Sequence, residues 1–187
     1  MAAFTERAIA ECFMSLLNEK TLDKITVKDI VDTCGINRST FYYYYEDVYD
    51  LLNKILEFET GKITESHKEC DTWVEGVEEA MSFALMNKKA VMHIYKSVSR
   101  EKLEKYIRSV VSSAMISAIR HQAKDTDASQ DDIALVADVY MYMLVGMIFK
   151  WLEDGMLEEP MDTIRKLGFL LEGNIHEMLL RAGKYKK

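Results

Sequence analysis

Proline and glycine, the residues that most often interrupt helices, are scarce in this chain. Its 187 residues include a single proline and eight glycines, and no stretch is of low complexity. Such a composition favours long helices joined by short connections. The first residues also lack a basic patch followed by an apolar run, so we expect no signal peptide.

No apolar run in the sequence is long enough to predict a transmembrane helix. The most apolar stretch covers residues 133–152, but Asp138 and Lys150 interrupt it and leave only 11 uncharged residues between them. A bilayer-spanning helix needs about 20 apolar residues. We therefore expect a helix that is buried on most sides, and no membrane contact.

Cysteine is rare, and its spacing does not indicate a metal centre. Cys12, Cys34 and Cys70 are odd in number, far apart and without a C-x-x-C pair, which is typical of reduced thiols in a cytoplasmic protein. His67 could share a helix face with Cys70, but two ligands do not make a metal site. We expect neither a metal nor any other cofactor.

The common catalytic motifs are missing as well. The chain has no glycine-rich phosphate loop, no H-E-x-x-H and no G-x-S-x-G, and the His-Glu pair at His176 lacks the second histidine. These absences argue against an enzyme.

The chain is instead rich in the apolar periodicity of amphipathic helices. Residues 4–17 repeat apolar side chains at helical intervals, and similar patterns predict helices over 47–68, 73–85, 88–98, 100–122, 131–153 and 160–181. Ser129 and Asp132 predict a capping box at the start of the helix over 131–153. No alternation typical of strands appears, so the predicted fold class is all-α.

A pair of short helices around a turn is predicted near the N-terminus. Thr26 and Asp29 have the spacing of a capping box, so a helix should begin near Val27. Gly35 marks a sharp turn, and Asn37 is a suitable cap for a second helix that begins at Arg38. Together they predict a helix-turn-helix unit, whose second helix enters the major groove of DNA.

The second helix carries the run "STFYYYYED", which by propensity alone would favour a strand. On a helix, Phe41 and Tyr45 lie four residues apart and should face the core, while Tyr42, Tyr43 and Tyr44 spread around the rest. Asp47 should then cap the next helix. The positions predicted to be exposed are Arg38, Ser39, Thr40, Tyr42, Tyr43 and Tyr44.

The same segment carries a family resemblance. The DNA-binding signature of the tetracycline-repressor (TetR) family is similar to "ITVKDIVDTCGINRSTFYYYYEDVYDLL", within a match over about residues 4–58. Other three-helix DNA-binding modules are the alternative. The resemblance implies about nine helices, a DNA-binding domain in residues 1–48, and a domain for effector binding and homodimer formation in residues 49–187. "FKWLEDGMLEEP" further resembles the C-terminal domain of a TetR subgroup from low-GC Gram-positive bacteria.

The resemblance also implies particular DNA contacts. Thr26 and Lys28 should touch phosphates, as should Tyr42 and Tyr44. The base edges should be contacted by Arg38, Ser39, Thr40 and Tyr43. The full predicted DNA-binding set is Thr26, Lys28, Asn37, Arg38, Ser39, Thr40, Tyr42, Tyr43 and Tyr44.

Three departures from the family pattern point to weak non-specific DNA binding. Val48 stands where the family commonly has a phosphate-binding lysine, and Tyr44 replaces a frequent histidine. Residues 1–50 contain five basic and nine acidic side chains, a net charge of minus four. Because cations supply most non-specific affinity, we expect a shallow salt dependence. A helical protein-interaction module with weakened DNA binding remains an alternative.

The predicted function is a ligand-responsive repressor that binds a palindromic double-stranded DNA operator as a homodimer, with activation as an alternative. The helices near 131–153 and 160–181 should form the dimer interface, because the first is apolar on all sides. A pocket for an unknown small-molecule effector should lie between helices. Its candidate lining residues are Trp73, Met81, His93, Tyr106, Met115, Tyr140 and Met143.

Overall fold

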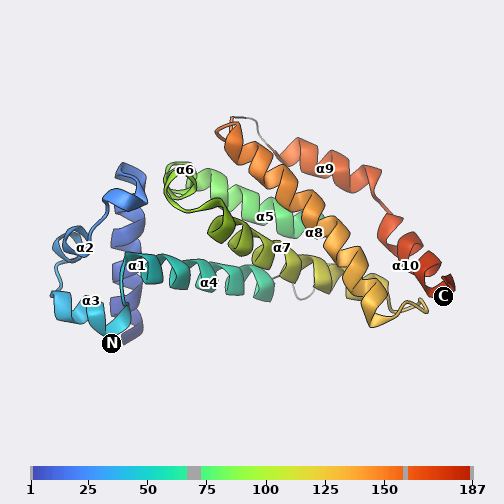
Figure 1. Cartoon of the computed structure of the whole chain (residues 1–187), viewed down its shortest axis with the longest axis horizontal. Helices are drawn as coiled ribbons and strands as arrows, with labels where there is room; N and C mark the ends of the chain where they lie inside the picture. Colours follow the sequence, from blue (N-terminus) through green and yellow to red (C-terminus); the bar gives the residue numbers. More distant parts are fainter. Residues whose placement is uncertain (1, 67–72, 158–159, 186–187) are drawn as a thin grey trace. The chain divides into compact units, whose positions relative to one another are not determined.

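The structure is a computed structural model that describes residues 2–66, 73–157 and 160–185 (Figure 1). Within these ranges it contains ten α-helices, one 3₁₀-helix and no strand, which confirms the all-α prediction. The pair His67 and Cys70 lies outside the described residues. The elements are α1 (Ala2–Glu19), η1 (Leu22–Lys24), α2 (Val27–Cys34), α3 (Arg38–Tyr44), α4 (Val48–Ser66), α5 (Trp73–Met86), α6 (Lys88–Ser97), α7 (Arg100–Gln122), α8 (Gln130–Glu153), α9 (Met161–Leu170) and α10 (Asn174–Lys184).

The chain forms two compact units. The N-terminal unit consists of Met1–Thr60 and Met86–Leu103, and the C-terminal unit consists of Gly61–Leu85 and Glu104–Lys187. The N-terminal unit thus includes α6, which the local sequence did not associate with the helix-turn-helix. The functional boundary between residues 48 and 49 stays a prediction.

One hydrophobic core holds the N-terminal unit together. Its fully buried side chains come from α1, α2, α3, α4 and α6, and burial of each large apolar side chain contributes about 1.5–3 kcal/mol. They include Ile9, Phe13 and Leu17 of α1, Ile30 of α2, Phe41 of α3, Leu51 of α4 and Ala90 of α6. The orientation of α2 and α3 is therefore determined by packing against α1, α4 and α6.

Polar contacts add to the packing of α6 in this unit. His93 Nδ1 lies 2.6 Å from the carbonyl oxygen of Leu17, and Ser97 Oγ donates to Asp23 Oδ1 at 3.1 Å. His93 therefore belongs to the N-terminal unit, and not to a pocket in the C-terminal unit. Cys12 and Cys34 carry free, half-buried thiols, and burial together with the neighbouring Cys12 raises the pKa of the Cys34 thiol to about 11.

The C-terminal unit is built around α8, ten of whose side chains are buried. Ser129 and Asp132 form the predicted capping box at its start. On another side of the unit α9 lies close to α5. A Cβ atom added to Gly168 of α9 would lie only 2.5 Å from Cγ2 of Val74 in α5. The Arg165 Nε donates to Glu78 Oε1 at 2.6 Å across the same pair of helices.

By length and composition alone, α8 could cross a membrane. It is the one such helix among the described residues, and the core helix of a globular protein meets the same test. Ten side chains of α8 are buried, as expected for the core helix of a globular protein.

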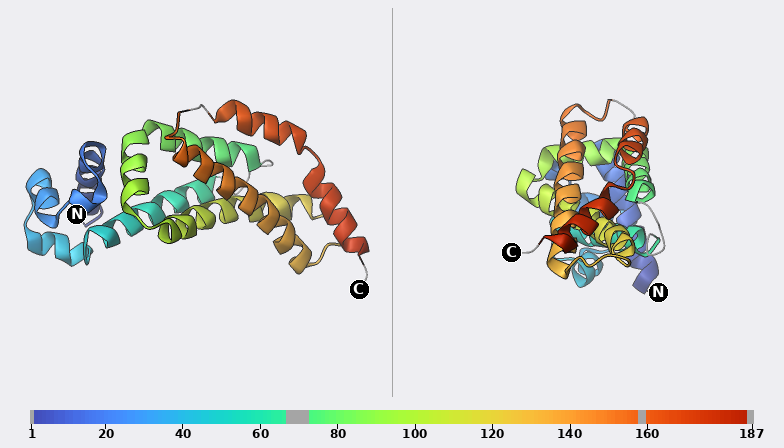
Figure 2. Two further views of the ribbon diagram at one scale, coloured as in Figure 1. Left: turned by 45° about the horizontal axis from the view of Figure 1, so that its top comes forward. Right: turned by 90° about the vertical axis from the view of Figure 1, so that its right-hand side faces the viewer.

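The predicted single helix over 160–181 is wrong. The chain forms two helices there, α9 and α10, and Figure 2 shows that their axes differ in direction. Gly173 lies between them in the left-handed conformation, with φ of 72°. Side-chain periodicity continues across the break, so the apolar pattern alone did not reveal it.

Candidate nucleic-acid interface

The start of α2 is fixed by the predicted capping box. The Asp29 N–H donates to Thr26 Oγ1 at 3.2 Å, and the Thr26 N–H donates to Asp29 Oδ2 at 2.8 Å. The Thr26 hydroxyl also donates to Asp29 Oδ2 at 2.7 Å, and Lys20 Nζ lies 3.0 Å from the same oxygen. These contacts, with the Thr26 hydroxyl first, lower the pKa of Asp29 to about 2.

The turn after α2 depends on Gly35. Its φ of 70° lies in the left-handed region, which residues with a side chain adopt only at a cost. The Gly35 and Ile36 N–H groups both reach back to the carbonyl of Val31 and close the end of the helix. The chain then leaves the turn so that α3 begins at Arg38, as predicted.

Asn37 occupies the N-cap position of α3, but its side chain makes no capping hydrogen bond. The predicted position is thus right, while the predicted capping by its side chain is wrong. At the start of α3 the Asn37 backbone carbonyl accepts from the N–H groups of Thr40 and Phe41. The side chain of Asn37 is exposed.

The tyrosine run divides between core and surface. Phe41 is fully buried and Tyr45 nearly so, and their ring centroids lie 5.6 Å apart. Tyr42 and Tyr43 are 56% and 80% exposed, which confirms their predicted outward orientation. Tyr44 differs from the prediction, because it is half-buried and packs against the core. It follows Phe41 by three residues and so shares much of the same helix face.

The polar residues predicted to contact DNA remain accessible around α2 and α3. Thr26 and Lys28 are exposed at the beginning of α2, and Arg38 and Ser39 are exposed in the first turn of α3. Thr40 is half-buried. The helix-turn-helix therefore presents one guanidinium, several hydroxyls and two exposed phenols.

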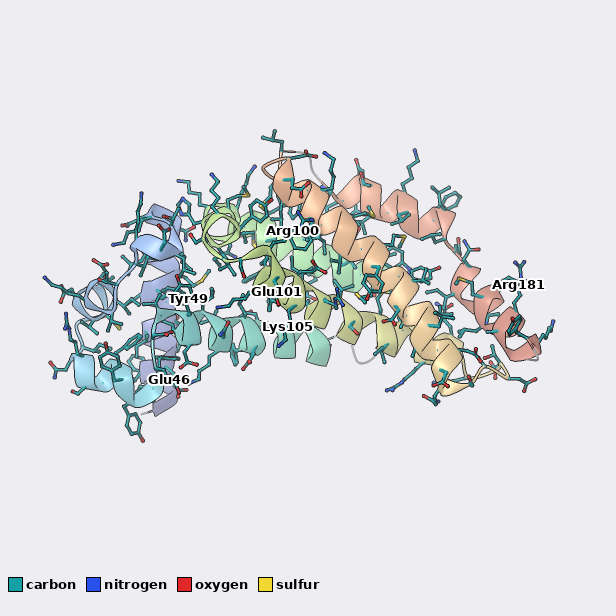
Figure 3. All side chains as sticks on the ribbon, viewed as in Figure 1. Glu46, Tyr49, Arg100, Glu101, Lys105 and Arg181 are labelled. Carbon is teal, nitrogen blue, oxygen red and sulfur yellow. The ribbon has the colours of Figure 1, made fainter. Side chains whose placement is uncertain are left out.

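The junction between α3 and α4 is closed by acidic side chains, and Figure 3 labels Glu46 and Tyr49 there. Asp47 Oδ1 accepts from the N–H groups of Tyr49 at 2.7 Å and Asp50 at 2.8 Å, which confirms the predicted cap. Asp50 Oδ2 accepts the N–H of Glu46 at 2.9 Å. Acids in this first turn also suit the positive end of the helix dipole.

Val48 is buried in the core of the N-terminal unit. A valine at this position therefore contributes to packing, and it offers no charge to a phosphate. Nearby, Lys102 Nζ lies 5.7 Å from the centroid of the Tyr49 ring, on which it can form a cation–π contact.

A pocket of about 530 Å³ lies in the C-terminal unit between α5, α8 and α9. Most of its lining is apolar, with an ion pair between Lys150 and Asp154 at 2.6 Å. Such a mixture is typical of small-molecule sites. Its lining includes Val77, Met81, Tyr142, Met143, Met147, Trp151, Thr163 and Ile164.

The structure brings only part of the predicted effector set together. Met81 and Met143 line this pocket, whereas Trp73 and Tyr140 contact each other in the core with ring centroids 6.2 Å apart. Burial raises the pKa of Tyr140. Met115 is fully buried, Tyr106 is half-buried on α7, and His93 belongs to the other unit.

Several residues that line this pocket were not predicted from the sequence. Met147 and Trp151 follow Met143 at intervals of four, so the helical period of α8 could have identified them. Thr163 comes from α9, and no local signal connects it to α8.

The outward side of α8 carries exposed apolar residues at helical spacing. Leu135, Val139 and Tyr142 are all exposed, and their intervals of four and three place them on one face. On α9, Phe169 and Leu170 are exposed as well. Exposed apolar groups that cluster in this way usually mark a contact with another protein.

The all-α fold and the accessible helix-turn-helix formed by α2 and α3 are those of a helix-turn-helix transcriptional regulator. Residues 14–55 match the family described as bacterial regulatory proteins, tetR family, and residues 71–173 match the TetR model described as transcriptional regulator C-terminal region. The chain belongs to the TetR family of transcriptional regulators, and it carries that family's N-terminal DNA-binding domain.

Two relatives are similar in sequence over part of their length. The HTH-type dhaKLM operon transcriptional activator DhaS of Lactococcus lactis subsp. lactis (strain IL1403) is 30% identical over 69 residues, which is 37% of either chain. The uncharacterized HTH-type transcriptional regulator YxbF of Bacillus subtilis (strain 168) is 28% identical over 57 residues, 30% of this chain and 15% of that one. The chain thus matches well under half the length of these relatives.

Three solved structures share the fold. The dihydroxyacetone kinase operon activator DhaS has a TM-score of 0.75 at 20% identity and covers 91% of this chain and 96% of its own. A TetR transcriptional regulator from Streptococcus agalactiae 2603V has a TM-score of 0.64 at 21% identity, with coverages of 91% and 94%. NalD, the secondary repressor of the MexAB-OprM multidrug efflux pump in Pseudomonas aeruginosa, has a TM-score of 0.62 at 17% identity, with coverages of 97% and 99%.

Proposed function

We propose that this regulator is a ligand-responsive repressor that binds a palindromic operator in the cytoplasm as a homodimer. The division of the aromatic run carries the proposal. Phe41 and Tyr45 anchor α3 in the core, and Tyr42 and Tyr43 are left exposed beside Arg38. Exposed phenols next to a guanidinium suit a duplex, which offers phosphate oxygens and base edges.

Each accessible side chain has a role that follows from its chemistry. Arg38 donates to a guanine or a phosphate, and Ser39, Thr40 and Tyr43 meet the base edges. Thr26, Lys28, Tyr42 and Tyr44 contact phosphates. Asn37 lies beside them at the turn. Tyr44 is half-buried, so less of its side chain is available for such a contact than of Tyr42.

Homodimer formation places two reading helices on one duplex. The exposed apolar face of α8 (Leu135, Val139 and Tyr142) is the surface that a second copy covers, with α9 and α10 beside it. The two α3 helices then enter successive major grooves about 34 Å apart.

The effector site is the pocket between α5, α8 and α9. An apolar ligand of moderate size fits its volume of about 530 Å³. Because α8 contributes both to this pocket and to the proposed dimer face, a ligand that favours one arrangement of α8 also shifts the population of DNA-competent dimers.

Gel-shift titration of the full chain against the DNA upstream of its own gene tests DNA recognition. Arg38→Ala should weaken binding, whereas Arg181→Ala should not, although both remove one exposed arginine. Arg181 lies on α10, where Figure 3 labels it, and its Nε donates to Glu177 Oε1 at 2.8 Å. Failure of the wild type to bind at low salt would favour the protein-interaction module.

Activation is the second candidate, because the chain is similar in sequence and fold to DhaS, which is described as an operon activator. A transcriptional reporter behind the bound DNA separates the two. Deletion of the regulator raises expression from a repressed promoter and lowers it from an activated one.

A further inference from the structure

The reading helix α3 depends on contacts from outside itself. It has seven residues, the fewest of the described α-helices, and no side chain caps its start. A helix of this length is not stable alone in water. At its other end, the chain turns extended at Tyr45, with φ of −137° and ψ of 139°.

Lys54 of α4 supplies a contact at this end. Its ammonium donates to the backbone carbonyl of Tyr44, the last residue of α3, at 2.7 Å. The last four carbonyls of a helix have no partner within the helix, and a cation there is favourable. Lys54 Nζ also lies 3.2 Å from Asp50 Oδ2 and 5.1 Å from the centroid of the Tyr45 ring.

The same contacts continue into the junction and back to α3. Asp50 accepts the Glu46 N–H, so the carboxylate that pairs with Lys54 also holds the first residue after Tyr45. The Tyr44 ring meets the Tyr43 ring edge-to-face, with centroids 4.9 Å apart. A shift of Tyr44 would therefore move Tyr43, the most exposed phenol of α3.

We propose that Lys54 is a positioning residue for DNA recognition, which fixes the C-terminal end of α3 and through Tyr44 the place of Tyr43. It acts within the protein, and its ammonium does not serve as a phosphate ligand. The inference rests on the proposed binding of DNA by α3. A half-exposed lysine in a DNA-binding domain would ordinarily be assigned to a phosphate, so the experiment must separate the two roles.

The test uses the full chain, a duplex that the wild type selects from a random pool, and a scrambled duplex of the same composition. The variants are Lys54→Met, which keeps the length of the side chain, Lys54→Arg, which restores a donor, and Lys28→Met as the comparison for a phosphate contact. Each is measured over a range of salt concentrations, alone and combined with Tyr43→Phe. Amide hydrogen exchange of residues 41–46 is followed without DNA.

We expect Lys54→Met to weaken binding to the selected duplex about tenfold, the effect of losing one well-placed contact, with an unchanged salt slope. Exchange at Tyr45 should become faster, because its N–H bond to the Phe41 carbonyl closes the end of α3. The combination with Tyr43→Phe should be less than additive, since both changes act on the same phenol. Lys54→Arg should recover most of the affinity. Lys28→Met should instead reduce the salt slope by about 1 and combine additively with Tyr43→Phe.

Three results would overturn the inference. A reduced salt slope for Lys54→Met with unchanged exchange would make Lys54 a phosphate ligand. Faster exchange without loss of affinity would make it a structural contact only, and no change in either would leave it without a role. If the wild type selects no duplex, the proposed function itself fails, and the inference that depends on it fails for that separate reason.

Discussion

The helices α3 and α8 both expose large side chains, but the exposed groups differ in chemistry. On α3 they are Tyr42 and Tyr43, whose rings end in hydroxyls, and on α8 they include Leu135 and Val139, which have no polar atoms beyond the backbone. A phenol remains favourable beside water and phosphate, whereas an aliphatic side chain is stabilised only in a dry contact. The contrast supports the proposed division of the two surfaces between DNA and a second copy of the chain.

The two helices also differ in how they are held. α8 begins with a complete capping box and buries ten of its own side chains, so its fold depends little on what covers its outer face. α3 lacks a side-chain cap and is held by Phe41, Tyr45 and Lys54. Changes on the outer face of α8 should therefore affect association, while changes near α3 should affect both stability and recognition.

The largest effect should come from a charge on the outer face of α8. Val139→Asp would place an unpaired carboxylate in the proposed dimer interface, at a cost of several kcal/mol, so the dimer dissociation constant should rise by more than a hundredfold. Sedimentation of the full chain measures this change. Ala134→Asp is the control, since Ala134 is exposed on α8 but off the apolar face. A Val139→Asp variant that stays dimeric would remove α8 from the interface.

A pair of glycines offers the next comparison. Gly35 and Gly146 both have open space where a Cβ atom would be placed, but only Gly35 has a positive φ. Gly35→Ala should lower the free energy of unfolding by about 1–2 kcal/mol, whereas Gly146→Ala, inside α8, should raise it by about 0.5–1 kcal/mol. Urea unfolding of both variants is the measurement. Equal effects of the same sign would contradict the role given to the turn before α3.

A smaller change compares two exposed phenols. Tyr43→Phe should weaken binding to the selected duplex about fivefold, because loss of one hydrogen bond costs about 1 kcal/mol. Tyr185→Phe should leave DNA affinity unchanged, because Tyr185 is an equally exposed phenol that lies beyond α10 and outside the pocket. Fluorescence anisotropy with labelled duplex can resolve this difference. Equal losses from the two variants would show that the Tyr43 hydroxyl has no particular role in DNA recognition.

The smallest effect concerns the capping boxes of α2 and α8, in which hydrogen bonds lower the pKa of Asp29 and of Asp132. A carboxyl with a lowered pKa adds stability above its unfolded value of 3.8 that disappears as pH falls toward the folded value, about 2 for Asp29. Asp29→Asn should therefore flatten the acid side of the stability curve between about pH 4 and pH 2. Salt should reduce the Asp29 effect more than that of Asp132, because Lys20 contributes only to the former. Urea unfolding of the wild type and Asp29→Asn between about pH 2 and pH 5 checks the first statement. NMR titration of the two carboxyls in the wild type at low and high salt checks the second.

Local sequence was sufficient for features that local contacts create. Both capping boxes, the turn at Gly35 and the burial of Phe41 and Tyr45 followed from residue type and spacing. Contacts between distant residues could not be predicted in this way. Lys54 reaches Tyr44 across ten positions, and α6 joins the N-terminal unit through Ala90, which resembles any other small residue of a helix.

The pocket proposed for the effector shows the same limit. Methionines and aromatic residues fill both cores and pockets, so composition did not distinguish Met81, which lines the pocket, from Met115, which is buried in the core. The sequence pattern did not predict the break at Gly173 between α9 and α10, because the apolar period is similar on both sides of it. These features depend on how separate helices pack, and a pattern within one helix does not contain that information.

Site-specific photo-crosslinking tests the division of surfaces most directly. A benzophenone amino acid replaces Tyr43 in one full-length variant and Tyr142 in another, and each is irradiated with the selected duplex. We predict that position 43 crosslinks to DNA and that position 142 crosslinks to a second copy of the chain. Crosslinking of position 43 to protein alone, or of position 142 to DNA, would contradict the assignment of α3 to the duplex and α8 to the dimer.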